Sequence, residues 1–144
     1  RLQLMEDYNL STLCNSGALL TRLIGDPPRD QWDVDPEHIY WNAHVDKANI
    51  ATYDYSALLY LNDFHTDFEG GEFEFIDDDK NRIVEPKAGR LVTFTSGPEN
   101  LHRVRRVSRG TRHVLAMWFT CSAEHQYADD DEQEQSGATE LKKE

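Results

Sequence analysis

Several features are scarce in this chain, and each scarcity narrows what the protein can be. Only two cysteines occur, Cys14 and Cys121, which is too few for a disulfide framework, and they are not spaced as a metal clip. A single bond between them stays open. No apolar run is long enough to cross a bilayer and no signal-like stretch is present, so we expect no membrane contact from this segment. Because residue 1 is an arginine, we expect a processed or excised piece of a longer protein.

Basic residues are also scarce, with 15 lysines and arginines against 27 aspartates and glutamates and a net charge of -12. The average field of such a surface repels phosphate backbones, which argues against general nucleic-acid binding. A local basic face stays open, because arginines cluster within residues 103–109. Residues 128–144 are acidic and polar, and they bury too little to offset the entropy of ordering, so we expect a disordered tail.

The rest of the chain, residues 1–127, is long enough for one domain. Apolar residues at helical spacings predict two short helices within residues 1–26, separated by Asn15-Ser16-Gly17 and ended by Pro27-Pro28. Short strand-like segments divided by turn sequences occupy residues 32–125, which indicates a mainly β jelly roll. The expected strands cover residues 37–43, 53–62, 72–76, 82–85, 90–95, 102–107 and 112–120.

Three side chains in the β region form a candidate metal site. Residues i and i+2 of an extended strand project to the same side, so His44 and Asp46 can face one ion together. His102, from a distant part of the chain, would complete a set of two histidines and one carboxylate. That ligand set, with positions left open, is typical of non-heme Fe(II) oxygenases.

Arg112 is the fourth candidate residue. A strand from residue 102, a Ser-Arg-Gly-Thr turn over 108–111 and a second strand would bring Arg112 back beside His102. Its planar guanidinium suits bidentate pairing with a carboxylate, so it could hold the far end of a dicarboxylate that chelates iron. Arg112 opens the most apolar run of the chain, an unusual place for a charge without a role. Val114, Ala116 and Trp118 share its parity and should face the interior, whereas His113 should face away.

These motifs together resemble the 2-oxoglutarate and Fe(II)-dependent dioxygenases of the prolyl hydroxylase type. The resemblance covers about residues 37–125. Within this family it is nearer to the prolyl 3-hydroxylase (leprecan) branch and to a related branch of oxygenase-domain proteins, and His44-Val45-Asp46-Lys47 and Glu99-Asn100-Leu101-His102-Arg103-Val104 favour the second. The other segments that carry it are Asp54–Asn62, Gly70-Gly71-Glu72-Phe73, Glu85–Arg90 and Thr95–His102.

The resemblance implies a function for these residues. Fe(II) would bind His44, Asp46 and His102, with no catalytic side chain beyond these ligands, and 2-oxoglutarate would bind Arg112 with the help of Tyr60, beside Trp118. Dioxygen would be the second co-substrate, and ascorbate is a further cofactor candidate. The expected reaction is hydroxylation of a side chain in a protein or peptide substrate, proline being the first candidate.

The resemblance also bears on architecture and location. It implies a double-stranded β-helix with N-terminal helices packed on the larger sheet. It favours the endoplasmic reticulum or another secretory membrane system, with the cytoplasm as the alternative, and a membrane anchor in the parent protein stays open. Substrate and oligomeric state are not set by the sequence.

Three alternatives remain at this stage. The chain could be a non-catalytic jelly-roll binding module or an incomplete fragment of an oxygenase, and a cupin-like barrel could use the same ligands for another metal. That barrel would not need Arg112. Two further histidines are set aside, since His65 falls in an acidic loop and His38 is too far along the strand from His44.

Overall fold

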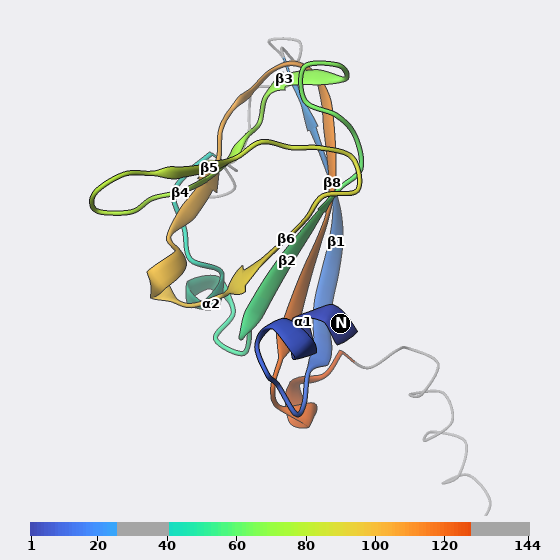
Figure 1. Ribbon diagram of the computed structural model, residues 1–144, viewed down its shortest axis with the longest axis vertical. Coiled ribbons are helices and arrows are strands. Elements are labelled where there is room, and N and C mark those ends of the chain that lie inside the picture. The colour runs from blue at the N-terminus through green and yellow to red at the C-terminus, as the bar shows by residue number, and fades with distance from the viewer. Residues whose placement is uncertain (26–40, 128–144) are drawn as a thin grey trace, which may run out of the picture.

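The computed structural model describes residues 1–25 and 41–127, which form two antiparallel β-sheets (Figure 1). The predicted tail and residues 37–40 of the first predicted strand lie outside the described residues. The larger sheet has the order β1 (Cys14–Ile24), β8 (Val107–Thr120), β2 (Tyr55–Tyr60) and β6 (Leu91–Thr95), and β3 (Phe68–Gly70) pairs with the start of β8. The smaller sheet has the order β5 (Arg82–Val84), β4 (Phe73–Phe75) and β7 (His102–Val104). The mainly β jelly-roll prediction is confirmed.

Helices are few and short in the described part of the chain. They are α1 (Leu2–Asp7), α2 (Asp46–Asn49) and the 3-10 helices η3 (Pro98–Asn100) and η4 (Ala123–His125). None of them is long and apolar enough to cross a membrane. The first helix packs on the larger sheet through Leu4, which joins Leu13, Ala57 and Phe119 in one buried cluster.

A second buried cluster joins the two sheets. Phe73 and Phe75 of the smaller sheet pack against Tyr60, Phe94 and Val114 of the larger one. Phe73 and Phe75 meet edge to face, with ring centroids 5.0 Å apart. Aromatic side chains of this size bury much apolar surface for each residue, so this cluster fixes the distance between the sheets and the walls of the space beside it.

The prediction of a second N-terminal helix is wrong, because those residues form β1, which pairs along its length with β8. Its alternation is hidden in the sequence. Leu19 and Leu23 line the cavity on one side of β1, although Leu19 is still 54% exposed, and the other side is also apolar, with Leu20 63% and Ile24 38% exposed. Because apolar residues occur on both sides of β1, their spacing in the sequence resembles that of a helix. Pairing within the sheet overrides such local patterns. The expected break at Asn15-Ser16-Gly17 is a register shift within β1.

The predicted hairpin between His102 and Arg112 is also wrong. β7 and β8 belong to different sheets, and residues 108–111 lie within β8. Gly110 serves a close approach in place of a turn: a Cβ atom there would lie 2.1 Å from the carbonyl oxygen of Asp67, and its φ is +76°. Glycine therefore lets β3 pair with β8 at this point.

The alternation in residues 72–76 predicts one buried face, yet all of β4 is buried, including Glu74. Its carboxylate accepts hydrogen bonds from Arg103 Nε at 2.7 Å, Arg105 Nη2 at 2.9 Å and Asn81 Nδ2 at 3.1 Å. These bonds, that of Arg105 foremost, lower the pKa of Glu74 to about 2. Arg103 and Arg105 therefore link β7 and the residue after it to β4 through Glu74.

Candidate metal and 2-oxoglutarate site

The first pair of candidate ligands sits where the chain passes from extended backbone into a short helix. His44 forms a bridge to His102, with both backbone hydrogen bonds made, at 2.8 and 3.0 Å. Val45 is extended, with φ -122° and ψ 126°, and Asp46 begins α2. Residues 41–43 form no strand, so the predicted strand does not reach His44. The extended Val45 alone keeps His44 and Asp46 on one side.

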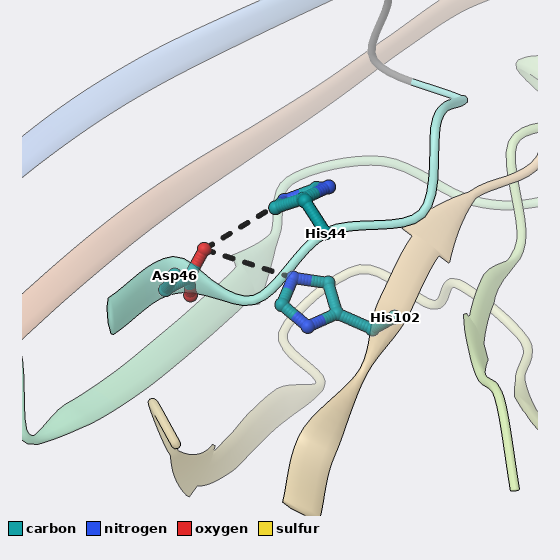
Figure 2. Close-up of side chains that lie close together, drawn as sticks. All are labelled: His44, Asp46 and His102. Carbon is teal, nitrogen blue, oxygen red and sulfur yellow. Dashed lines mark ion pairs between the residues drawn. The ribbon is translucent and has the colours of Figure 1, made fainter. Parts of the chain in front are cut away.

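The structure brings His44, Asp46 and His102 together (Figure 2). One oxygen of Asp46, Oδ1, lies 3.7 Å from Nε2 of His44 and 3.7 Å from Nε2 of His102. One ligand atom from each residue falls within 4.8 Å of the others. Three donors of this kind around one point fit a transition metal with open positions.

Both histidines are oriented by backbone carbonyls. Nδ1 of His44 donates to the carbonyl oxygen of Asn42 at 3.0 Å, and Nδ1 of His102 donates to that of Asn100 at 2.8 Å. Because a carbonyl only accepts, each Nε2 keeps its lone pair directed at the site, an arrangement typical of metal-binding histidines. Burial lowers the pKa of His102, which favours the neutral ring that a metal requires.

Asp46 is 8% exposed and its second oxygen is held from the other side. Oδ2 accepts a hydrogen bond from Ser56 Oγ at 2.5 Å, and that hydroxyl lies 2.7 Å from Ser96 Oγ. Sequence reasoning missed both serines. The signal was available for Ser56, since it shares strand parity with the inward-facing Leu58 and Tyr60 of β2.

A cavity of about 240 Å³ opens beside the three candidate ligands, and Arg112 lines it. Arg112 is only 2% exposed. Val114, Ala116 and Trp118 line the same cavity, as the parity of β8 predicts, and His113 is not among its lining residues. The planar guanidinium offers several donors in a cavity lined mostly by apolar side chains, which suits bidentate binding of a carboxylate.

Tyr60 lies beneath this arginine. The guanidinium carbon of Arg112 is 5.3 Å from the centre of the Tyr60 ring. Burial raises the pKa of Tyr60, although the charge of Arg112 opposes this effect. Within the described ranges, its buried hydroxyl has no hydrogen-bond partner. Tyr60 is not among the residues that line the cavity, so its contact with 2-oxoglutarate stays a prediction.

Trp118 stacks on Tyr53, with ring centroids 5.2 Å apart and planes 10° from parallel. Tyr53 lies in the segment between α2 and β2. His65 takes no part here, because its side chain is 67% exposed and pairs with Glu69. His38 lies outside the described residues.

Fold and site define one class of protein. A family model for the 2OG-Fe(II) oxygenase superfamily matches residues 36–120, and the chain belongs to that superfamily. Its members use Fe(II), 2-oxoglutarate and dioxygen, and the donor set of two imidazoles and one carboxylate fits Fe(II). The family resemblance inferred from the motifs is thus confirmed.

Two relatives show which members of the superfamily this chain is similar to. The "2-oxoglutarate and iron-dependent oxygenase domain-containing protein 3" of Xenopus tropicalis is 54% identical over 90 residues, which cover 62% of this chain and 28% of that protein. Prolyl 3-hydroxylase 2 of Rattus norvegicus is 53% identical over 70 residues, covering 46% of this chain and 10% of that enzyme. The chain therefore spans little more than a quarter of the first of these relatives.

Solved structures show the same fold. A 2OG-Fe(II) oxygenase family oxidoreductase from Burkholderia pseudomallei superposes with a TM-score of 0.65 at 17% identity, covering 83% of this chain and 49% of that one. A prolyl-4-hydroxylase from Pseudomonas putida superposes with a TM-score of 0.60 at 26% identity, covering 85% of this chain and 61% of that one.

Proposed function

We propose that this chain is the catalytic part of an Fe(II)- and 2-oxoglutarate-dependent dioxygenase that hydroxylates a side chain of a protein or peptide, proline being the first candidate. One observation supports this most strongly. His44, Asp46, His102 and Arg112 come from three separate stretches of the chain and line one cavity. A binding module without oxidative chemistry would need neither the ligand set nor a buried arginine next to it.

The metal-binding role falls to His44, Asp46 and His102. Both imidazoles present Nε2, because their Nδ1 atoms are engaged by carbonyl oxygens. Asp46 presents Oδ1 and adds one negative charge, which suits a divalent cation in a half-buried position. The three side chains occupy one side of the metal position, so the cavity side stays open to other ligands.

Arg112 and Tyr60 are proposed to bind the distal carboxylate of 2-oxoglutarate. The guanidinium offers several donors in a plane, and the Tyr60 hydroxyl can add one more. A carboxylate held by Arg112 would leave the keto-acid end of the same molecule to bind beside the histidines that line the same cavity, which is catalysis by orientation. Trp118 would form a flat wall beside it.

Fe(II), when bound with 2-oxoglutarate and dioxygen, supplies the oxidation that converts 2-oxoglutarate to succinate and carbon dioxide and hydroxylates the substrate. The side chains of this protein bind, orient and shield. The apolar side chains that line the cavity, Leu23, Phe94 and Val114 among them, would limit the access of water to the reacting groups. Ascorbate stays a candidate for keeping the metal reduced.

The substrate class is supported by similarity alone. Relatives with the name prolyl 3-hydroxylase 2 share about half of the aligned residues, and the Pseudomonas putida structure is of a prolyl-4-hydroxylase. A protein or peptide with an accessible proline is therefore the first substrate to try.

The test is an anaerobic titration of the Fe(II)-loaded protein with 2-oxoglutarate, following the visible metal-to-ligand charge-transfer band. We expect a band in the wild type and none in His102→Ala. His113→Ala is the matched control, since it changes a neighbour of Arg112 that does not line the cavity, and it should behave as wild type. A folded wild type that binds iron but gives no band would overturn the proposal.

A further inference from the structure

Two buried serines lie behind the candidate metal ligand Asp46. Ser56 and Ser96 are each 1% exposed. Ser56 lies on β2, and Ser96 directly follows β6, so the two hydroxyls come from neighbouring strands of the larger sheet. Their oxygens are 2.7 Å apart, and Ser56 Oγ is 2.5 Å from Asp46 Oδ2. The three side chains form one buried chain of hydrogen bonds.

The number of hydroxyl protons decides which residue donates in each of these hydrogen bonds. An ionised carboxylate only accepts, so Ser56 must donate its single hydroxyl proton to Asp46 Oδ2. Ser56 can then only accept from its other neighbour, and Ser96 must be the donor between the two serines. The order is Ser96 to Ser56 to Asp46, and every hydroxyl proton in it is used.

Backbone hydrogen bonds hold both ends of this series of hydrogen-bonded side chains. The carbonyl oxygen of Ser96 accepts from the N–H of Lys47, the residue after Asp46, at 3.0 Å, and the N–H of Ser96 donates to the carbonyl oxygen of Asp54 at 2.9 Å. Lys47 also pairs with the Asp54 carboxylate at 2.7 Å. Ser96 is thus attached to the short helix that carries Asp46 by a backbone bond as well as through Ser56.

The two oxygens of Asp46 therefore have separate environments. Oδ1 faces the two Nε2 atoms at 3.7 Å each, whereas Oδ2 is held on the opposite side by a short, charge-assisted hydrogen bond. A carboxylate can bind a metal through one oxygen or through both, and the second mode occupies one more coordination position. An oxygenase needs those positions for the keto acid and dioxygen.

We propose that Ser56, supported by Ser96, is a positioning residue that restricts Asp46 to binding the metal through Oδ1 alone, and so keeps a coordination position open for 2-oxoglutarate. This proposal rests on the proposed function. Loss of the Ser56 hydroxyl would release Oδ2 to swing towards the metal, and the freed carboxylate would compete with the incoming keto acid.

Cobalt(II) in place of iron gives the test, because its visible spectrum responds to the number and arrangement of its ligands and needs no turnover. The wild type, Ser56→Ala and Ser96→Ala are loaded with Co(II), and affinity is measured by calorimetry. For Ser56→Ala we expect a changed Co(II) spectrum, a dissociation constant for Co(II) altered by about 10-fold, and weaker binding of 2-oxoglutarate to the loaded protein. Ser96→Ala leaves Ser56 in place but removes the hydroxyl that donates to it. This variant should change the Co(II) spectrum, the Co(II) dissociation constant and the binding of 2-oxoglutarate in the same direction as Ser56→Ala, but by a smaller amount.

Ser108→Ala is the matched control, because Ser108 is an exposed serine on β8, and it should match the wild type in every measurement. A Ser56→Ala protein with the wild-type spectrum and wild-type affinities would overturn the proposal. Should Ser56→Ala fail to fold, Ser96→Ala decides, and an unchanged spectrum there overturns it equally. A wild type that binds neither Co(II) nor 2-oxoglutarate would overturn the proposed function and this inference together, so the two failures are distinguishable.

Discussion

His102 and Arg112 are ten residues apart in the chain yet belong to different sheets, and they line the same cavity from β7 and β8. Residues 105 and 106 take the chain across from the smaller sheet to the larger one between them. The ten-residue spacing between His102 and Arg112 therefore includes the passage of the chain from one sheet to the other. It brings the imidazole proposed to bind the metal and the guanidinium proposed to bind a carboxylate to one cavity.

Replacing Arg112 should separate keto-acid binding from metal binding. In Arg112→Ala, we expect about 100-fold weaker binding of 2-oxoglutarate, because two charge-assisted hydrogen bonds are lost, and unchanged affinity for Co(II). Calorimetry measures both. Arg109→Ala is the control, since that side chain is 61% exposed and pairs with Glu69. Equal loss of metal and keto-acid binding in Arg112→Ala would indicate a structural role.

Gly71 supports the position of Arg112. A Cβ atom on Gly71 would lie 2.8 Å from Cδ of Arg112 and 3.0 Å from Cγ2 of Val107, and the φ of Gly71 is +72°. Gly71→Ala should therefore lower the free energy of unfolding by about 1–3 kcal/mol and displace the arginine. We expect weaker 2-oxoglutarate binding as well, measured by the same calorimetry.

Gly89→Ala isolates the backbone contribution to that effect. Gly89 has a similar φ of +79°, but a Cβ there meets no atom within 4 Å. It should cost about 1 kcal/mol in stability and leave 2-oxoglutarate binding unchanged. Equal effects of the two substitutions on the keto acid would contradict the steric argument.

The sequence predicted most of the fold because turn signals divide the strands clearly. Gly70-Gly71 and residues 86–89 bound short strands, and β4, β5 and β6 lie where expected. β1 was missed because its outward face carries Leu20 and Ile24, and an apolar outer face removes the alternation on which strand prediction depends. Only the long-range pairing with β8 decides that segment, and a single sequence does not contain it.

Some residues of the candidate site could be predicted from the sequence and others could not. His44, Asp46 and His102 could be selected since the chemistry needs those side chains, and strand parity placed Arg112 and Trp118 on the inner face. The route between His102 and Arg112 was wrong because Ser108–Thr111 has the composition of a turn, and Gly110 there is required by the approach of β3. Strand parity could have placed Ser56 on the inner face, but its contact with Asp46 and Ser96 depends on long-range packing that a single sequence does not contain.

Removing the hydroxyl of Tyr60 should affect the complex more than the free protein. The ring belongs to the cluster between the sheets and stays in Tyr60→Phe. Because the hydroxyl is buried without a hydrogen-bond partner in the described part of the chain, we expect little change in melting temperature. Binding of 2-oxoglutarate should weaken by about 5–10-fold, the value of one hydrogen bond. An unchanged affinity would remove Tyr60 from the proposed keto-acid site.

Glu74 should make the fold sensitive to acid. Its pKa in the folded protein is about 2, below the ordinary value of 4.5, chiefly because of the hydrogen bond from Arg105. A lowered pKa means that the unfolded chain binds more protons in this range, so stability is present in full above about 4.5 and is lost as pH falls towards 2. The loss should be of the order of 1–3 kcal/mol.

The free energy of unfolding, measured by urea titration at several pH values, checks this contribution. Glu74→Gln should be less stable than wild type at pH 7, since Arg103 and Arg105 lose their shared carboxylate, and its stability should fall less steeply between pH 4.5 and 2. Glu85→Gln removes the same charge from an exposed position and should keep the steep wild-type slope. If Glu74→Gln kept that slope as well, the acid sensitivity would have to come from other carboxylates, and the bonds of Arg103 and Arg105 to Glu74 would contribute little to folding.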